Sequence, residues 1–191
     1  MPADASSPGP QDAAWVATEG PAAGASDTEP NGPAPTRPGD PVILCGACTR
    51  RGSCRLGVER EQLRRWDTAV FDLHCPRDQE GGPEVAHGGW IAAVLDECGG
   101  HLPLLNNVMS VTAELTVNFV KPVPVQRALQ ARAWVDRREG SRWYIGVELM
   151  LLPGRAVLAT ASGIWVTRDK GHFDRHRAWL AEQDTAGSDQ A

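Results

Sequence analysis

Residues 86–100, which read AHGGWIAAVLDECGG, bring a histidine, two glycines and a carboxylate close together. Their apolar residues recur every three or four positions, which predicts a helix with one buried face. The start of such a helix, near Gly88, would carry unpaired backbone N–H groups and the positive end of the helix dipole. Asp96 would lie about 10 Å further along, at about 1.5 Å rise per residue. An oxyanion site and a carboxylate arranged in this way would suit attack on a carbonyl carbon.

Two stripes of residues run along the predicted helix. The first is apolar and is expected to face a sheet; it contains Ile91, Val94, Leu95, Cys98 and Leu102. The second combines small residues with one acid, and contains Gly89, Ala92, Ala93, Asp96, Gly99 and Gly100. Small side chains let a second backbone or a ligand approach closely, so this stripe is expected to border a cleft. Glu97 falls outside it, toward Trp90 and His101, which predicts that Asp96 is the acid that faces the cleft. The alternative is an ordinary solvated acid beside glycines that serve packing or turns.

The remaining chain supplies elements that could position this helix. Four β-like runs follow it, separated by turns that contain proline or glycine, at residues 109–120, 127–136, 143–152 and 156–167. Two earlier runs, 55–63 and 64–74, are also predicted strands, and a glycine-rich loop at 77–86 leads into the helix. A short closing helix is expected at 173–183. This order predicts an α+β fold in which an antiparallel sheet wraps around one central helix.

Composition bounds the domain organisation and the partners. Residues 1–40 contain eight of the 15 prolines and six acids against one base, which predicts a disordered tail. We expect one domain at 41–184, with 41–57 as a cysteine-containing opening segment and 185–191 as a flexible tail. The first 40 residues account for the net charge of −5, so the neutral body offers no footprint for nucleic acid or an anionic membrane. The chain shows no export signal and no membrane-length apolar run, which predicts a cytoplasmic protein.

The cysteines are candidates for a metal site. Cys45, Cys48 and Cys54 form C-x2-C-x5-C, and Cys75 lies 21 residues further on. Four thiolates could hold a structural zinc ion, although this spacing matches no standard zinc finger. The alternative is a set of reduced thiols without metal. No other metal or cofactor is expected.

Four stretches of the sequence carry a family resemblance. EGGPEVAHGGWIAAVLDECGG combines a glycine-containing loop, HGG and an acid nine positions after the histidine, and VTAELTVNFVKPVP begins with a threonine and ends with a lysine and prolines. VDRREGSRW contains arginines around a glycine, and CGACTRRGSCRLGV contains the cysteines. In these features the chain resembles the hotdog-fold acyl-CoA thioesterases, in particular the PaaI-like branch with phenylacetyl-CoA thioesterase and the human thioesterase superfamily members. The resemblance runs from about residue 45 to residue 167.

The resemblance implies a function and roles for individual residues. It implies hydrolysis of an acyl-CoA thioester, with Asp96 as general base for water or as nucleophile. The Gly88 N–H, with Gly89 nearby, would stabilise the oxyanion, and Thr112 would orient the water, usually from the other subunit of a dimer. It also implies a homodimer or homotetramer with sites at the subunit interface. Alternation along the strand places Thr112 on the face opposite Leu115 and Val117.

Further residues are candidates for binding the substrate. Bases in or beside turns could meet the phosphates of coenzyme A, although such charges are usually solvated; they are Lys121, Arg137, Arg138 and Arg142. His87 and Trp90 adjoin the glycines, and Trp90 could restrict the acyl channel. The chain departs from some relatives at Gly81, where they place an asparagine. The rival hypotheses are a non-catalytic acyl-CoA-binding hotdog protein and, with weaker support, a hotdog dehydratase.

Overall fold

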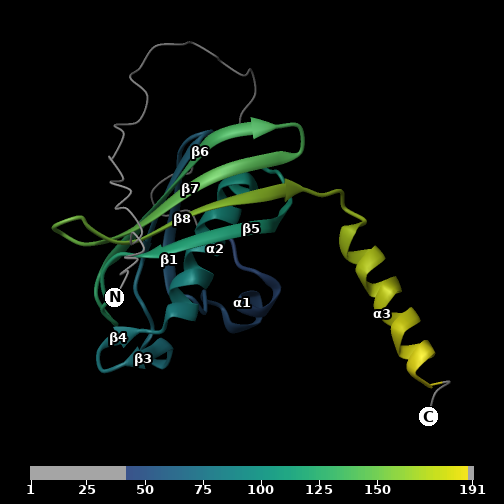
Figure 1. The fold of residues 1–191 in the computed structure, drawn as a ribbon, viewed down its shortest axis with the longest axis horizontal. Helices are drawn as coiled ribbons and strands as arrows, with labels where there is room; N and C mark the ends of the chain where they lie inside the picture. Colours follow the sequence, from purple (N-terminus) through teal and green to yellow (C-terminus); the bar gives the residue numbers. More distant parts are fainter. Residues whose placement is uncertain (1–41, 189–191) are drawn as a thin grey trace, which may run out of the picture. The chain divides into compact units, whose positions relative to one another are not determined.

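The computed structural model describes residues 42–188, so the predicted tail at 1–40 lies outside the described residues. A six-stranded antiparallel sheet covers the helix α2 (Gly88–Leu105), as Figure 1 shows. The predicted α+β arrangement of a sheet around one helix is therefore confirmed. No helix within residues 42–188 is both long and apolar enough to cross a membrane.

The predicted elements are present with small changes of boundary. In chain order they are α1 (Gly46–Arg51), β1 (Val58–Arg65), β2 (Thr68–Leu73), the 3-10 turn η1 (Arg77–Gln79), β3 (Glu80–Gly82), β4 (Val85–Ala86), α2, β5 (Ser110–Phe119), β6 (Leu129–Glu139), β7 (Arg142–Leu151), β8 (Ala156–Thr167) and α3 (His172–Ser188). The short helix α1 lies within the cysteine-containing opening segment. The glycine-rich loop before α2 forms η1 and the small β3–β4 hairpin. The closing helix, expected to end at residue 183, continues to Ser188.

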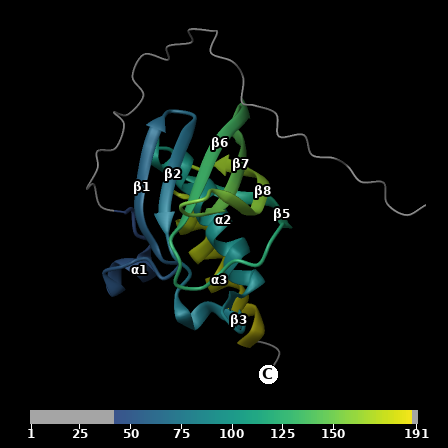
Figure 2. The ribbon, with the colours of Figure 1, turned by 90° about the vertical axis from the view of Figure 1, so that its left-hand side faces the viewer.

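The order of strands in the sheet is β1-β2-β6-β7-β8-β5, with every neighbouring pair antiparallel. The two edge strands are therefore β1 and β5. Figure 2 shows these two strands on opposite sides of α2. The helix contacts β2, β5, β6, β7 and β8, so it lies along the middle of the sheet with an edge strand on each flank.

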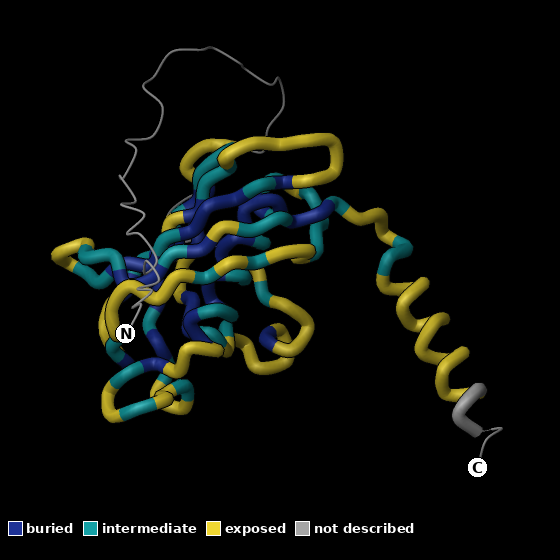
Figure 3. The backbone as a smooth tube through the Cα atoms, viewed as in Figure 1, coloured by how far each residue is buried: buried dark blue, intermediate teal, exposed yellow. Residues whose placement is uncertain are grey.

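The apolar stripe of α2 forms the centre of the core. Its predicted members are all buried: Ile91, Val94, Leu95, Cys98 and Leu102. Figure 3 shows buried backbone running through α2 and the central strands, whereas most of α3 is exposed. Burying an aliphatic side chain of this kind contributes about 1.5 to 3 kcal/mol, so this stripe anchors the helix and fixes its rotation.

The stripe of small residues packs differently from the prediction. A Cβ atom on Gly99 would lie 2.3 Å from Cζ2 of Trp165, and one on Gly100 would lie 3.2 Å from its Nε1. The two glycines therefore make room for an indole ring of the protein's own core, and the prediction that they border a cleft is wrong. The half-buried part of the stripe that could still border a cleft contains Ala92, Ala93 and Asp96.

Candidate active site

Asp96 and Thr112 meet where α2 faces β5. The Thr112 hydroxyl donates a hydrogen bond of 2.7 Å to Oδ1 of Asp96. The family resemblance implied a threonine from the other subunit, but the structure brings both residues together within one chain. The pair therefore forms between α2 and the edge strand β5 of the same chain.

A β-bulge in β5 aims Thr112 at the helix. The register between β5 and β8 shifts between Thr112 and Glu114, which leaves Ala113 as the extra residue. Beyond the bulge, Leu115 and Val117 also pack against the core. The prediction from simple alternation, that Thr112 lies on the face opposite these two residues, is therefore wrong, because a bulge reverses the alternation at that point.

The surroundings of Asp96 favour a proton acceptor. The residue is half-buried, and burial raises the pKa of its carboxyl group, while the hydrogen bond from Thr112 opposes that shift. The negative charge of the adjacent Glu97 raises the pKa further. A carboxylate with a raised pKa accepts a proton more readily at neutral pH.

The Gly88 N–H is open at the N-terminus of α2, whereas the Gly89 N–H is not. Nδ1 of His87 accepts a hydrogen bond of 2.9 Å from the Gly89 N–H, so His87 caps the helix. This bond occupies the Gly89 amide, which corrects the prediction that both glycine amides are available. The Gly88 N–H has no hydrogen-bond partner within residues 42–188. The ring of Phe119, which is 60% exposed, lies beside Gly88.

Gly88 and Asp96 of one chain lie too far apart to serve one carbonyl group. They are eight residues apart on a continuous helix, which corresponds to about 12 Å along its axis. An oxyanion donor must lie about 3 Å from the carbonyl oxygen of the substrate, which becomes negatively charged when the attacking water loses its proton to the base. A site that uses both groups therefore needs them from different chains.

A cavity of about 410 Å³ opens beside Asp96. Its walls come from α1 and the segment after it, from η1 and from α2, and its lining residues are Arg51, Arg55, Leu56, Asp78, Gln79, Ala93, Asp96 and Glu97. Glu97 thus borders the same cavity as Asp96, which corrects the prediction that only one of the two acids faces it. Adjacent helical residues point about 100° apart, so a wide cavity can reach both.

Two arginines of the cavity were missed from the sequence. Arg51 and Arg55 lie in the run TRRGSCR, and its three arginines could have indicated a basic wall. The neighbouring cysteines instead favoured the prediction of a zinc site. Gly81 lies too close to the backbone for a side chain, since a Cβ there would be 2.7 Å from Cα of His87. No asparagine fits at that position, and the amide in the cavity is that of Gln79.

Glu97 belongs to a buried ionic network on the β1 side of α2. Nε2 of His101 lies 3.3 Å from Glu97, and its Nδ1 lies 2.6 Å from Glu61 of β1. Glu61 is 1% exposed and also accepts a hydrogen bond of 2.5 Å from the Ile43 N–H. Burial disfavours a charge on His101, but the bonds to both acids outweigh this and raise its pKa to about 10. The bond from His101 lowers the pKa of Glu97, against the effect of burial.

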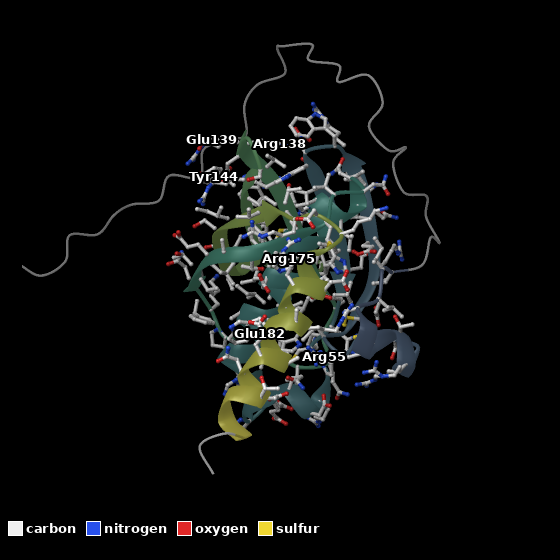
Figure 4. All side chains as sticks on the ribbon, turned by 90° about the vertical axis from the view of Figure 1, so that its right-hand side faces the viewer. Arg55, Arg138, Glu139, Tyr144, Arg175 and Glu182 are labelled. Atoms are coloured by element: carbon white, nitrogen blue, oxygen red, sulfur yellow. The ribbon has the colours of Figure 1, made fainter. Side chains whose placement is uncertain are left out.

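The predicted substrate-binding residues do not gather at this cavity. Trp90 is 2% exposed, and its indole N–H donates to the Leu56 carbonyl at 3.2 Å, so it belongs to the core and not to an acyl channel. Arg138 stacks on Trp143 at 4.4 Å near the β6–β7 turn. Figure 4 shows Arg138 at one end of the molecule, well separated from Arg55.

Three of the four predicted bases lie on the β6–β7 hairpin, and Lys121 lies elsewhere. Lys121 follows the end of β5 that pairs with the start of β8, whereas Arg142 pairs with Val166 near the other end of β8. Arg137 stacks on Tyr144 at 3.5 Å and pairs with Glu139. The hairpin therefore gathers three of these bases, away from Lys121 and outside the lining of the cavity beside Asp96.

The four candidate cysteines do not form a metal site within residues 42–188. The N–H of Cys48 and its thiol lower the pKa of the Cys45 thiol, so these two lie together at the start of α1. Burial raises the pKa of Cys75 to about 11. Among residues 42–188 no group of three or more His, Cys, Asp and Glu side chains could hold a metal ion. The described structure therefore does not support the zinc site proposed on Cys45, Cys48, Cys54 and Cys75.

Comparisons with known proteins bear on the matched part of the chain. Residues 84–158 match the thioesterase superfamily. The chain is 22% identical over 90 residues to mouse acyl-coenzyme A thioesterase THEM4, which covers 47% of this chain and 39% of that protein. It spans less than two thirds of the length of the curated relatives that it matches.

Solved structures share the fold. The Escherichia coli PaaI protein from the phenylacetic acid degradation operon superposes with a TM-score of 0.50 at 18% identity, over 53% of this chain and 73% of that chain. A hypothetical thioesterase of Streptococcus pneumoniae with coenzyme A gives 0.52 at 14% identity, over 57% and 89%. Residues 84–158 thus match the thioesterase superfamily, and the described residues share the hotdog-like fold of these solved structures.

Proposed function

We propose that the protein hydrolyses an acyl-CoA thioester to a free acid and coenzyme A. The observation that carries the proposal is the Asp96–Thr112 pair, a carboxylate of raised pKa held by a hydroxyl at the wall of a cavity. The match of residues 84–158 to the thioesterase superfamily supports it, as do the thioesterase activity in the name of the mouse relative and the coenzyme A in the streptococcal structure.

In the proposed reaction Asp96 acts as a general base. A water molecule contacts the free oxygen of Asp96 and the lone pairs of Thr112, and Asp96 takes its proton as the oxygen attacks the thioester carbonyl. The C–S bond then breaks, and the proton passes to the departing thiolate. The alternative is direct attack by Asp96, which forms a mixed anhydride. Single-turnover hydrolysis in ¹⁸O-labelled water distinguishes the two, because only the anhydride path places the label in Asp96.

The oxyanion donor is proposed to come from a second copy of the chain. The Gly88 N–H is open, but on the same chain it lies about 12 Å from Asp96 along the helix. The edge strand β5, which carries Thr112, has ten residues and can pair with another strand. Two copies joined through β5 would form one continuous sheet. We therefore propose a homodimer, or a homotetramer built from such dimers.

Substitution of the two groups tests the chemistry. A thiol-release assay on a panel of acyl-CoAs compares the wild type with Asp96→Asn and Gly88→Pro, each expected to lose about a hundredfold to a thousandfold or more in kcat. Proline is tolerated at the first helical position, and His87 already has the extended backbone that precedes proline, so Gly88→Pro removes the N–H without disrupting the helix. Gly88→Ala keeps the N–H and controls for added atoms; it should lose far less.

A mixture of the two inactive variants tests the shared site. After unfolding and refolding together, half of the dimers contain one chain of each kind, and each of these has one intact site. A shared site therefore restores about a quarter of the wild-type activity. A site within one chain restores none.

The rival hypothesis of acyl-CoA binding without cleavage makes a different prediction. Wild-type protein would then bind acyl-CoA but release no thiol, and Asp96→Asn would leave the rate unchanged. Cytoplasmic localisation stays a prediction from the sequence.

A further inference from the structure

The hydrolysis proposed above uses only one of the two adjacent acids that border the cavity. Glu97 is 26% exposed and lines the cavity, yet its bond to His101 ties it to the β1 side of the helix. Below it, His101 and Glu61 are almost completely buried. Three ionisable groups therefore connect the floor of the cavity with the edge strand opposite the one that carries Thr112.

Burying such an ionic network has a large cost in desolvation free energy. Removing charges from water costs several kcal/mol per ion, and well-packed apolar residues of similar volume often stabilise as much or more. The network is nevertheless fully paired: both ring nitrogens of His101 contact a carboxylate, and Glu61 also receives the Ile43 N–H. Its geometry holds one carboxylate, that of Glu97, ionised at the wall of the cavity.

We propose that the Glu61–His101–Glu97 network is a positioning device for the reaction. It holds a second, ionised carboxylate beside Asp96 and so sets the pH range in which Asp96 accepts a proton. Glu97 is a positioning residue in this scheme, because it acts through Asp96. The inference rests on the proposed function only for its effect on catalysis; the effect on Asp96 itself is independent of it.

Several polar and charged groups around Asp96 affect its ionisation. Thr112 faces it from β5 and favours the ionised form, while Glu97 on its own helix disfavours it. Arg51, Arg55 and Asp78 border the same cavity from α1, from the segment after it and from η1. His101 is held by Glu61 and lies 6.4 Å from the ring of Phe71 in β2. The negative charge of Glu97 thus opposes the ionisation of Asp96.

A titration of Asp96 itself provides the test. Its side-chain ¹³C carboxyl signal is followed by NMR in the wild type, Glu97→Gln and Glu97→Asp. Glu97→Gln keeps the shape and the bond to His101 but removes the charge, so the midpoint of Asp96 should move to lower pH. Glu97→Asp restores a carboxylate and should return the midpoint toward the wild-type value. The acid limb of the kcat/KM profile should move in the same direction as the midpoint.

Two further variants separate the network from a general effect of substitution. Glu61→Gln should lower the pH at which the His101 ring loses its proton, as read from ¹⁵N shifts. His74→Gln breaks the exposed pair of His74 with Glu59, which are 2.9 Å apart and lie outside the cavity. This variant should leave the midpoint of Asp96 unchanged.

The outcomes distinguish the two proposals. A midpoint of Asp96 that stays constant or rises in Glu97→Gln overturns the inference, whether or not the wild type hydrolyses acyl-CoA. A midpoint that falls in a protein without thioesterase activity upholds the inference about Asp96 and overturns the proposed function.

Discussion

Asp96 and Glu97 are neighbours on one helix, border one cavity and differ by one methylene group, yet their environments act in opposite directions. On the β5 side, burial raises the pKa of Asp96, and within residues 42–188 the one side chain that hydrogen-bonds to it is the neutral hydroxyl of Thr112. On the β1 side, the bond from the cationic His101 lowers the pKa of Glu97. The comparison shows that the partner, and not the acid, decides which carboxylate can act as a base.

The sheet creates this difference because its two edges flank the helix. Thr112 belongs to the edge strand β5, and Glu61, which supports His101, belongs to the edge strand β1. A neutral partner from one edge leaves a carboxylate reactive, whereas an ionic partner from the other edge holds a carboxylate charged and unreactive.

The largest expected effect is on catalysis and divides the two acids. Asp96→Asn should lower kcat by about a hundredfold to ten-thousandfold, the usual contribution of general base catalysis. Glu97→Gln should lower it far less, because it changes only the strength of the base. Thiol release at saturating acyl-CoA measures both. A larger loss in Glu97→Gln than in Asp96→Asn would reverse the assignment of the two acids.

The next effect is on the free energy of unfolding, and it should differ between Glu61 and Thr112, the residues that support the two acids. Glu61→Ala leaves the positive charge of His101 with only one partner in a buried site, which should lower the free energy of unfolding by about 3 to 5 kcal/mol. Thr112→Val removes the hydrogen bond to the Asp96 carboxylate and should lower it less, by about 1.5 kcal/mol. Urea unfolding measures both differences. Glu59→Ala, which breaks the exposed pair with His74, is the matched control and should change stability little.

A smaller effect is the direction in which the acid limb of the kcat/KM profile moves, which should differ between variants of Thr112 and Glu97. Thr112→Val removes the bond that favours ionised Asp96, so the acid limb of the kcat/KM profile should move to higher pH, opposite to its movement in Glu97→Gln. The rate should also fall by about tenfold or somewhat more, since a hydrogen bond to a charged group contributes about 1.5 to 3 kcal/mol. Thr112→Ser keeps the hydroxyl and should restore both. Movement of the limb in the same direction in both variants would contradict the opposed roles.

The last effect concerns the dependence of stability on pH. The pKa of His101 rises from 6.5 to about 10 on folding, so its contribution to stability is complete below pH 6.5 and disappears as the pH rises toward 10. The wild type should therefore be less stable at high pH. In His101→Gln this decrease should be smaller. Urea midpoints measured at about pH 6 and about pH 9 test the prediction, and equal decreases in both proteins would argue against a charged His101.

Several features could be predicted from local patterns because they depend on spacing alone. The apolar stripe from Ile91 to Leu102 follows the helical repeat, and its burial is confirmed. The four β-like runs after the helix are strands. His87 lies before α2, and Asp96 lies further along it.

Other features depended on contacts between distant segments. The bulge that aims Thr112 at Asp96 is a property of the pairing between β5 and β8. Gly99 accommodates Trp165, 66 residues away in the chain, so its packing role was invisible in the local sequence. Glu61 and His101, 40 residues apart, meet only because β1 flanks α2.

The sequence by itself determined the fold class, the helix that carries the reactive acid and the eight-residue spacing of Gly88 and Asp96, because these follow from periodicity and helical rise. The tertiary structure alone decided which partners the two acids have. Protonation depends on burial and on charges within a few ångströms, and those distances are set by how the two edges of the sheet close around α2.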